Sequence, residues 1–191
     1  MTYRVFVNPG HCPGVEPGCC NRELGLTEAE YVKEIGQLLT AELQKYGYNA
    51  RCMQTNNLRN AYDDDWDDPC IITEANDWCP DIAVSIHCNA FNGIANGTEC
   101  ICFERGSDGE RLARLIQNKI VPAIGTANRG VKYEEDKEKG KRLSFIMLTD
   151  MPAVVVECAF LDNYEDAMTL IENKDVIAKA ICQGIIEYFE V

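Results

Sequence analysis

Two histidines, His11 and His87, are the residues in this sequence best suited by type and position to do chemistry. They are the only histidines among its 191 residues. Each lies at the end of a short apolar run that reads as a strand, residues 3–8 for the first and 81–87 for the second. In an open parallel sheet, ligands and catalytic groups gather at the carboxyl ends of the strands. A single histidine at a strand end is commonly structural, but two at one edge favour a shared functional site.

A carboxylate at the start of a long predicted helix could join the two imidazoles. Glu28 precedes Val32 by four residues and Ile35 by seven, so it lies on the same helical stripe as these core residues and points inward. An acid at this position would also be favoured because it complements the helix dipole. Glu16 and Glu23, in the preceding loop rich in glycine and proline, remain alternative candidates for a ligand.

A second carboxylate, Glu157, follows the apolar run 152–156. An unpaired carboxylate at the end of a buried strand is costly, so Glu157 must reach solvent or have a partner. Two imidazoles and one carboxylate form a zinc ligand set that leaves a fourth position for water, and a further carboxylate can transfer protons. The sequence therefore contains every residue type that such a site needs. It has no H-E-x-x-H motif, which would place two ligands on one helix, so the spacing of the residues does not by itself identify the ligands.

The elements that must position these residues alternate between short apolar runs and longer amphipathic segments. The pattern predicts strands over residues 3–8, 50–54, 81–87, 98–103, 143–148 and 153–157, and helices over 28–46, 108–120, 164–172 and 175–189. Thr27 and Glu30 form a capping box before the first helix, and the second should stop before Pro122. Because no repeat or linker divides the chain, we expect one α/β domain over residues 1–191. Its sheet should be mostly parallel and twisted, with about six strands and helices on both faces.

Composition excludes several classes of protein. The chain has 18 basic and 31 acidic residues, a net charge of −13 that opposes broad contact with nucleic acid. No run is apolar enough to span a membrane, and no secretory leader is visible, so we expect synthesis in the cytoplasm. The eleven cysteines include no C-x-x-C pair and read mostly as free buried thiols. The charged segments 63–68 and 132–142 read as solvated surface loops.

Six segments, in order along nearly the whole chain, carry a family resemblance. They are NPGH at residues 8–11, Glu28 opening a long helix, VSIHCNA at 84–90, GTE at 97–99, NRGVK at 128–132 and PAVVVECAFLDN at 152–163. Together they resemble the zinc-dependent N-acetylmuramoyl-L-alanine amidases of family 3, which are autolysins and phage endolysins of bacterial cell walls. The S-I-H-x-N-A and V-E-x-x-F-x-x-N elements are the most specific part of this match.

The resemblance implies one zinc ion per chain, bound by His11, Glu28 and His87, and implies that Glu157 is the catalytic acid and base. The substrate would be peptidoglycan, and the reaction would hydrolyse the amide between N-acetylmuramic acid and the L-alanine of the stem peptide. The enzyme would act at the cell wall after release from the cytoplasm, as a monomeric catalytic domain with no wall-binding module.

Further residues of the same motifs could contact the muropeptide. These are Asn89, Asn128, Arg129 and Lys132. The stem peptide carries carboxylates that suit a guanidinium fork, although Gly130 alone would explain the NRGVK segment as a turn with solvated charges. Family members usually carry an arginine shortly before the Ala-Asn pair that precedes the S-I-H strand, whereas residues 71–76 of this chain contain none. This difference affects the expected local ion pairing or substrate docking, and not the expected metal ligands.

The sequence is also compatible with other classes of function. A cysteine-dependent amide hydrolase could use one of the thiols, although Cys88 and His87 would face opposite sides of a strand. A non-catalytic metal-binding or wall-binding module could hold a metal with thiolates, for example those of Cys19, Cys20, Cys100 and Cys102. A phosphate-binding protein is weakly supported, since no glycine-rich phosphate loop follows the first strand.

Overall fold

A six-stranded sheet runs through the centre of the molecule in the computed structural model, which describes residues 2–59 and 68–190. The strand order is β4-β1-β5-β8-β6-β7. The strands are β1 (Arg4–Pro9), β4 (Asn49–Cys52), β5 (Ile82–Asn89), β6 (Thr98–Cys102), β7 (Asn128–Tyr133) and β8 (Ala153–Phe160). Neighbouring strands are parallel except β6 and β8, which are antiparallel. The expected mostly parallel six-stranded sheet is therefore confirmed.

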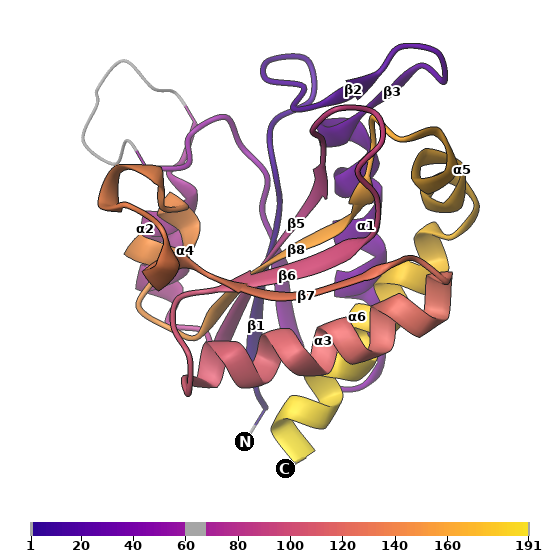
Figure 1. The fold of residues 1–191 in the computed structure, drawn as a ribbon. Coiled ribbons are helices and arrows are strands. Elements are labelled where there is room, and N and C mark those ends of the chain that lie inside the picture. The colour runs from indigo at the N-terminus through magenta and orange to yellow at the C-terminus, as the bar shows by residue number, and fades with distance from the viewer. Residues whose placement is uncertain (1, 60–67, 191) are drawn as a thin grey trace.

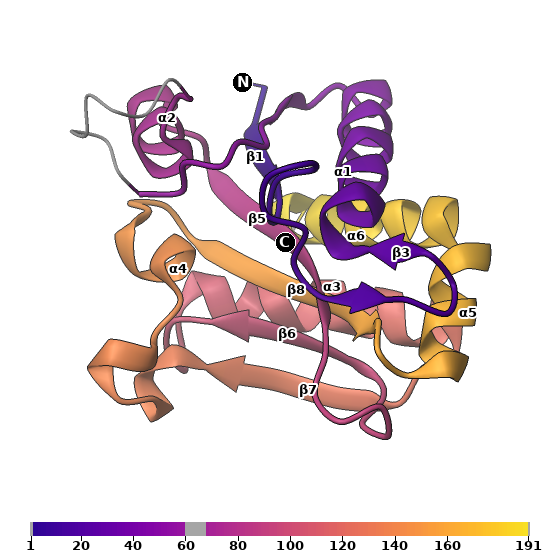
Figure 2. The same ribbon diagram turned by 90° about the horizontal axis from the view of Figure 1, so that it is seen from above.

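Helices cover both faces of this sheet, as the sequence predicts (Figures 1 and 2). On one face lie α1 (Glu28–Lys45), α3 (Asp108–Ile124), α5 (Tyr164–Glu172) and α6 (Lys174–Glu190), which contribute to the larger apolar core. On the other face, α2 (Ile71–Trp78) and α4 (Ser144–Leu148) cover a smaller core. A short hairpin of β2 (Cys20–Asn21) and β3 (Leu26–Thr27) precedes α1, and single 3-10 turns occupy Glu134–Asp136 and Lys139–Lys141. No helix within the described ranges is long and apolar enough to cross a membrane.

Two segments form elements other than those that the sequence predicts for them. The run 143–148, expected as a strand, forms helix α4, because a short apolar run does not distinguish a buried strand from a buried helix segment. The sixth strand of the sheet is instead β7, an edge strand over the NRGVK segment, which could also be explained from the sequence as a turn. The helix α2 has no counterpart among the predicted elements.

The second long helix continues beyond the predicted stop. Helix α3 includes Pro122 and ends only at Gly125, whose φ of 70° suits a residue without a side chain. Its stripe of Leu112, Ile116 and Ile120 is fully buried, and α6 approaches so closely that a Cβ at Gly184 would overlap Ile116. Val121 and Ile124, on either side of the proline, also pack against the larger core, which favours continuation of the helix through it.

The start of α1 also differs from the expected capping box. The Thr27 hydroxyl donates to the Glu30 carboxylate at 2.9 Å, and Thr27 makes no side-chain cap to the helix backbone. Instead, the Glu28 amide donates to the Cys19 carbonyl at 2.9 Å and the Ala29 amide donates to the Pro17 carbonyl at 3.0 Å. The preceding loop therefore satisfies the free N–H groups of the helix and is tied to its first turn.

The two charged segments have different outcomes. Of the run 63–68, only Asp68 falls within the described residues. The segment 132–142 is not simply a solvated loop, because it begins in β7 and includes Glu134, whose side chain is fully buried. That carboxylate accepts hydrogen bonds from Lys137 Nζ at 2.7 Å and from the Leu143 amide at 2.8 Å.

Candidate metal centre

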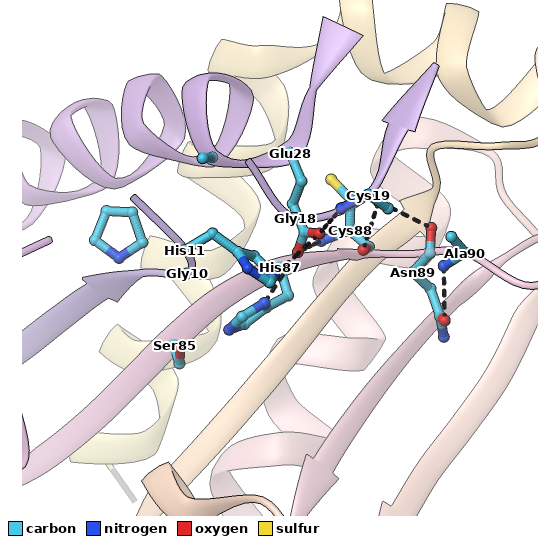
Figure 3. A network of polar contacts seen from close by, with 12 residues as sticks. Gly10, His11, Gly18, Cys19, Glu28, Ser85, His87, Cys88, Asn89 and Ala90 are labelled. Carbon is cyan, nitrogen blue, oxygen red and sulfur yellow. Dashed lines mark hydrogen bonds and ion pairs between the residues drawn. The ribbon is translucent and has the colours of Figure 1, made fainter. Parts of the chain in front are cut away.

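Three side chains from distant parts of the chain converge at one edge of the sheet (Figure 3). His11 lies two residues beyond β1, His87 lies near the carboxyl end of β5, and Glu28 is the first residue of α1. Glu28 Oε2 lies 3.1 Å from His11 Nε2, and Glu28 Oε1 lies 2.9 Å from His87 Nδ1. Their ligand atoms all lie within 4.8 Å of one another, and in the described part of the chain no other group of three such side chains does so.

The local backbone is built to bring these side chains together. Strands β1 and β5 are parallel neighbours, so the segments that carry the two histidines leave the sheet at the same edge. His11 adopts a left-handed φ of 59°, an uncommon conformation for a residue with a side chain. Gly10 lies against the His87 ring, and Gly18 lies against His11 and Glu28, at positions where any Cβ would overlap these groups. The site thus depends on two glycines that allow close approach.

Hydrogen bonds keep Glu28 ionised against the effect of its burial. Its side chain is only 3% exposed and accepts hydrogen bonds from the backbone amides of Cys19 and Cys88, both at 3.0 Å. Burial alone would raise the pKa of Glu28, but hydrogen bonds with the two histidines hold it below its usual range. Burial alone would lower the pKa of His11, but Glu28 and Glu16 outweigh it and raise that pKa to about 9.

This donor set fits a divalent metal ion. Two imidazole nitrogens and a carboxylate oxygen lie within 4.8 Å of one another, and a set of this kind can bind zinc while leaving a position free.

Glu157 borders the same site. It is the neighbour of His87 across the β5–β8 pair and lines a cavity of about 400 Å³ together with His11, Glu28 and His87. It lies inside β8, three residues before the strand ends at Phe160, rather than at the predicted strand end. Its Oε2 atom is buried and makes no hydrogen bond within the described residues. A carboxylate therefore faces the candidate metal site without a fixed partner.

Burial raises the pKa of Glu157 to about 7. His87 opposes this shift, whereas the carboxylates of Glu28 and Glu99 add to it. A carboxyl group with this pKa can hold or release a proton near neutral pH.

This shift predicts a pH-dependent loss of stability in the metal-free protein. Because the folded pKa of Glu157 lies above its ordinary value of 4.5, its contribution to stability is fully present below about pH 4.5 and is lost as the pH rises through 7. Metal-free Glu157→Gln lacks this loss, so its stability relative to wild type should increase between pH 5 and pH 8, by at most about 3 kcal/mol. Urea unfolding of both proteins at the two pH values tests this, and an unchanged difference would contradict the raised pKa.

Comparison with known proteins assigns the chain to a family. The family model described as N-acetylmuramoyl-L-alanine amidase matches residues 5–187. The chain belongs to this amidase family. It is 28% identical over 190 residues to the N-acetylmuramoyl-L-alanine amidase LytC of Bacillus subtilis, and 36% identical over 120 residues to an uncharacterized cell wall amidase of Bacillus anthracis. These alignments cover 97% and 58% of this chain, but only 35% and 21% of the two relatives.

A solved structure agrees with the family assignment. The N-acetylmuramoyl-L-alanine amidase of Clostridium difficile 630 superposes with a TM-score of 0.80 at 26% identity, covering 99% of this chain and 97% of that one. The resemblance expected from the sequence motifs, at the level of family and fold, is confirmed.

A network that the sequence did not reveal lies beside Glu157 in this amidase-family fold. Glu99 on β6 is directly opposite Glu157 on β8 and is only 8% exposed. It accepts a hydrogen bond from Asn89 Nδ2 at 3.0 Å and forms an ion pair with Arg129 Nε at 2.8 Å. The GTE motif contains Glu99, but its position beside Glu157 depends on the antiparallel β6–β8 pairing, which the sequence does not show.

The four residues expected to contact substrate fall into two groups. Asn89 lines the cavity, and both Asn89 and Arg129 donate hydrogen bonds to the carboxylate of Glu99. Asn128 accepts hydrogen bonds at Oδ1 from Gln117 and the Gly130 amide, and Lys132 Nζ donates to the carbonyl of Arg129. The side chains of Asn128 and Lys132 are thus bonded within and behind the edge strand, and neither they nor Arg129 line the cavity.

The cysteines do not support the alternative functions. All eleven are free thiols, and no cysteine belongs to a metal-binding group in the described chain. The thiolate site suggested by residues 19, 20, 100 and 102 is therefore not formed. Burial raises the pKa of the thiols of Cys19 and Cys88, the two that line the cavity, well above the ordinary range. A thiolate nucleophile is accordingly disfavoured at this site.

Proposed function

We propose that this chain is a zinc-dependent N-acetylmuramoyl-L-alanine amidase that hydrolyses the amide between N-acetylmuramic acid and L-alanine in bacterial peptidoglycan. The observation that carries the proposal is the meeting of His11, Glu28 and His87 with Glu157 at one cavity, in a chain of this amidase family. The amidase names of the relatives support the choice of substrate.

In this proposal, the three ligand side chains hold one zinc ion per chain. Zinc bound there would polarise the substrate carbonyl and lower the pKa of a water molecule at its open position. Glu28 supplies the only ligand charge, and its hydrogen bonds from two backbone amides keep it oriented. His11 and His87 approach from two different segments, which leaves the cavity side of the site open toward Glu157.

Glu157 is the proposed acid and base. It takes a proton from the attacking water as the new carbon–oxygen bond forms, and it returns a proton to the nitrogen of L-alanine as the carbon–nitrogen bond breaks. Its raised pKa of about 7 suits both transfers near neutral pH. Its position beside His87, in the same cavity as the proposed ligands, supports this role.

The proposed substrate contacts are Asn89, Asn128, Arg129 and Lys132. Asn89 and Arg129 are supported by their convergence on Glu99, next to Glu157. Asn128 and Lys132 lie on the same edge strand as Arg129, and their hydrogen bonds also help to hold that strand in place. We further propose that residues 1–191 act as a monomeric catalytic domain that is made in the cytoplasm and reaches the wall after release.

The chemistry of the products tests the function directly. Purified peptidoglycan digested by the zinc-loaded protein should acquire new amino-terminal L-alanine residues, identified by labelling of free amines, and no new reducing sugar ends. Chelation should abolish the release, and added zinc should restore it. New reducing ends without L-alanine termini would identify a glycosidase and overturn the proposal.

Arg129→Ala should weaken substrate binding without disturbing the metal. Removing a charge-assisted hydrogen bond typically costs about 1.5–3 kcal/mol, so KM for a soluble muropeptide should rise about tenfold or more while kcat changes less. The exposed residue Lys179 on α6 offers a matched control, and Lys179→Ala should leave KM unchanged. An unchanged KM in Arg129→Ala would remove this residue from the substrate contacts.

A further inference from the structure

The two ring nitrogens of His11 face two different carboxylates. His11 Nε2 lies 3.1 Å from Glu28, the proposed ligand. His11 Nδ1, on the other side of the ring, contacts Glu16 Oε2. Glu16 does not belong to the group of potential ligand atoms formed by His11, Glu28 and His87. It therefore contacts a candidate ligand on the side that faces away from the metal position.

The loop between β1 and β2 is built to hold Glu16 in this position. The amides and carbonyls of Cys12 and Glu16 exchange two hydrogen bonds of 2.9 Å, which close the loop immediately after His11. The other carboxylate oxygen of Glu16 accepts a hydrogen bond from the Gly18 amide at 3.2 Å. The Glu16 side chain is thus fixed at both oxygens, although it is exposed.

The same loop is bonded to the helix that supplies Glu28. Two hydrogen bonds join residues 17 and 19 to the first two amides of α1, and the Cys19 amide donates to Glu28 itself. Glu16 and Glu28 are therefore held at fixed positions on opposite sides of the His11 ring. His87 has no such second carboxylate, since within the described residues its Nε2 makes no hydrogen bond and its Nδ1 faces Glu28.

A histidine that binds a metal usually donates its other ring N–H to a carboxylate, a carbonyl or water, which fixes the tautomer and the orientation of the ring. We propose that Glu16 is a positioning residue for the metal centre, which holds the proton of His11 on Nδ1 and directs Nε2 toward the ion. This inference assumes the metal site of the proposed function and assigns Glu16 a role outside the ligand set. Loss of such an outer partner typically lowers metal affinity about 10–100-fold.

The test is the zinc affinity of purified Glu16→Ala and Glu16→Gln proteins, measured by competition with a chromophoric chelator at constant pH. Both variants should bind zinc about 10–100-fold more weakly than wild type, with the larger loss in Glu16→Ala. Glu23→Gln is the matched control, because Glu23 is exposed in the same region, and it should bind zinc like wild type. Thermal unfolding of the metal-free proteins checks that the exposed substitutions leave the fold intact.

A spectroscopic readout separates positioning from ligation. With Co²⁺ in place of zinc, the absorption bands of Glu16→Ala should keep the shape and intensity of wild type once the site is saturated, because the ligands are unchanged. Bands that show a lost ligand would make Glu16 a ligand and overturn the inference, as would an unchanged zinc affinity or a wild-type protein that binds no zinc. If zinc binding weakens as expected but the wild-type protein releases no L-alanine termini, the proposed reaction fails while the role of Glu16 stands.

Discussion

Glu157→Gln is expected to lower kcat for release of L-alanine termini by about 10²–10⁴-fold while leaving zinc bound. Glutamine has nearly the same size as glutamate but cannot take a proton from water or return one to the departing amine. Glu157 lies beside His87 and outside the ligand group, so its replacement should not remove a metal contact. Single-turnover kinetics on a soluble muropeptide, with zinc content measured on the same samples, tests both parts of this expectation.

The matched control for this variant is Glu104→Gln, at an exposed position after β6. It should retain the activity and zinc content of wild type. If Glu157→Gln released L-alanine at the normal rate, the proposed acid and base would be wrong. If it lost its zinc as well, Glu157 would be acting on the metal site rather than on the reaction.

Glu28→Gln is expected to bind zinc more weakly by a larger factor than the roughly 10–100-fold typical of an outer partner, because it removes the only charged ligand. Activity should fall with the loss of metal. The neutral side chain keeps an oxygen that can accept from the Cys19 or Cys88 amide, so folding should survive better than in Glu28→Ala. Metal analysis after dialysis against a weak chelator measures the effect.

Glu30→Gln, on the exposed side of the same first turn, is the control for this second variant. It should retain zinc. Full zinc content in both Glu28→Gln and Glu28→Ala would remove Glu28 from the ligand set. Glu16 and Glu23, in the loop before α1, would then be the alternative ligand candidates.

The core of the site was predictable because it follows from regular structure. The two histidines lie at the ends of apolar runs that form adjacent parallel strands, and helical periodicity alone places Glu28 on the buried side of α1. These rules depend on spacing along single elements, which a sequence displays directly.

The parts of the fold and of the site that the sequence does not predict depend on contacts between different helices, strands and loops. The pairing of β6 with β8 brings Glu99 beside Glu157, and no local pattern specifies that pairing. The run 143–148 forms a helix because it packs over the smaller core, although its composition suits a strand equally well. Glu16 could be recognised only as one of several loop acids, since its contact with His11 depends on a loop closed by backbone hydrogen bonds.

Anomalous diffraction at the zinc absorption edge, from crystals grown with one equivalent of zinc, tests the metal centre most directly. We expect one strong peak per chain, within coordination distance of His11, Glu28 and His87 and facing the cavity that Glu157 borders. A peak at other side chains, or no peak in protein that still releases L-alanine from peptidoglycan, would contradict the account.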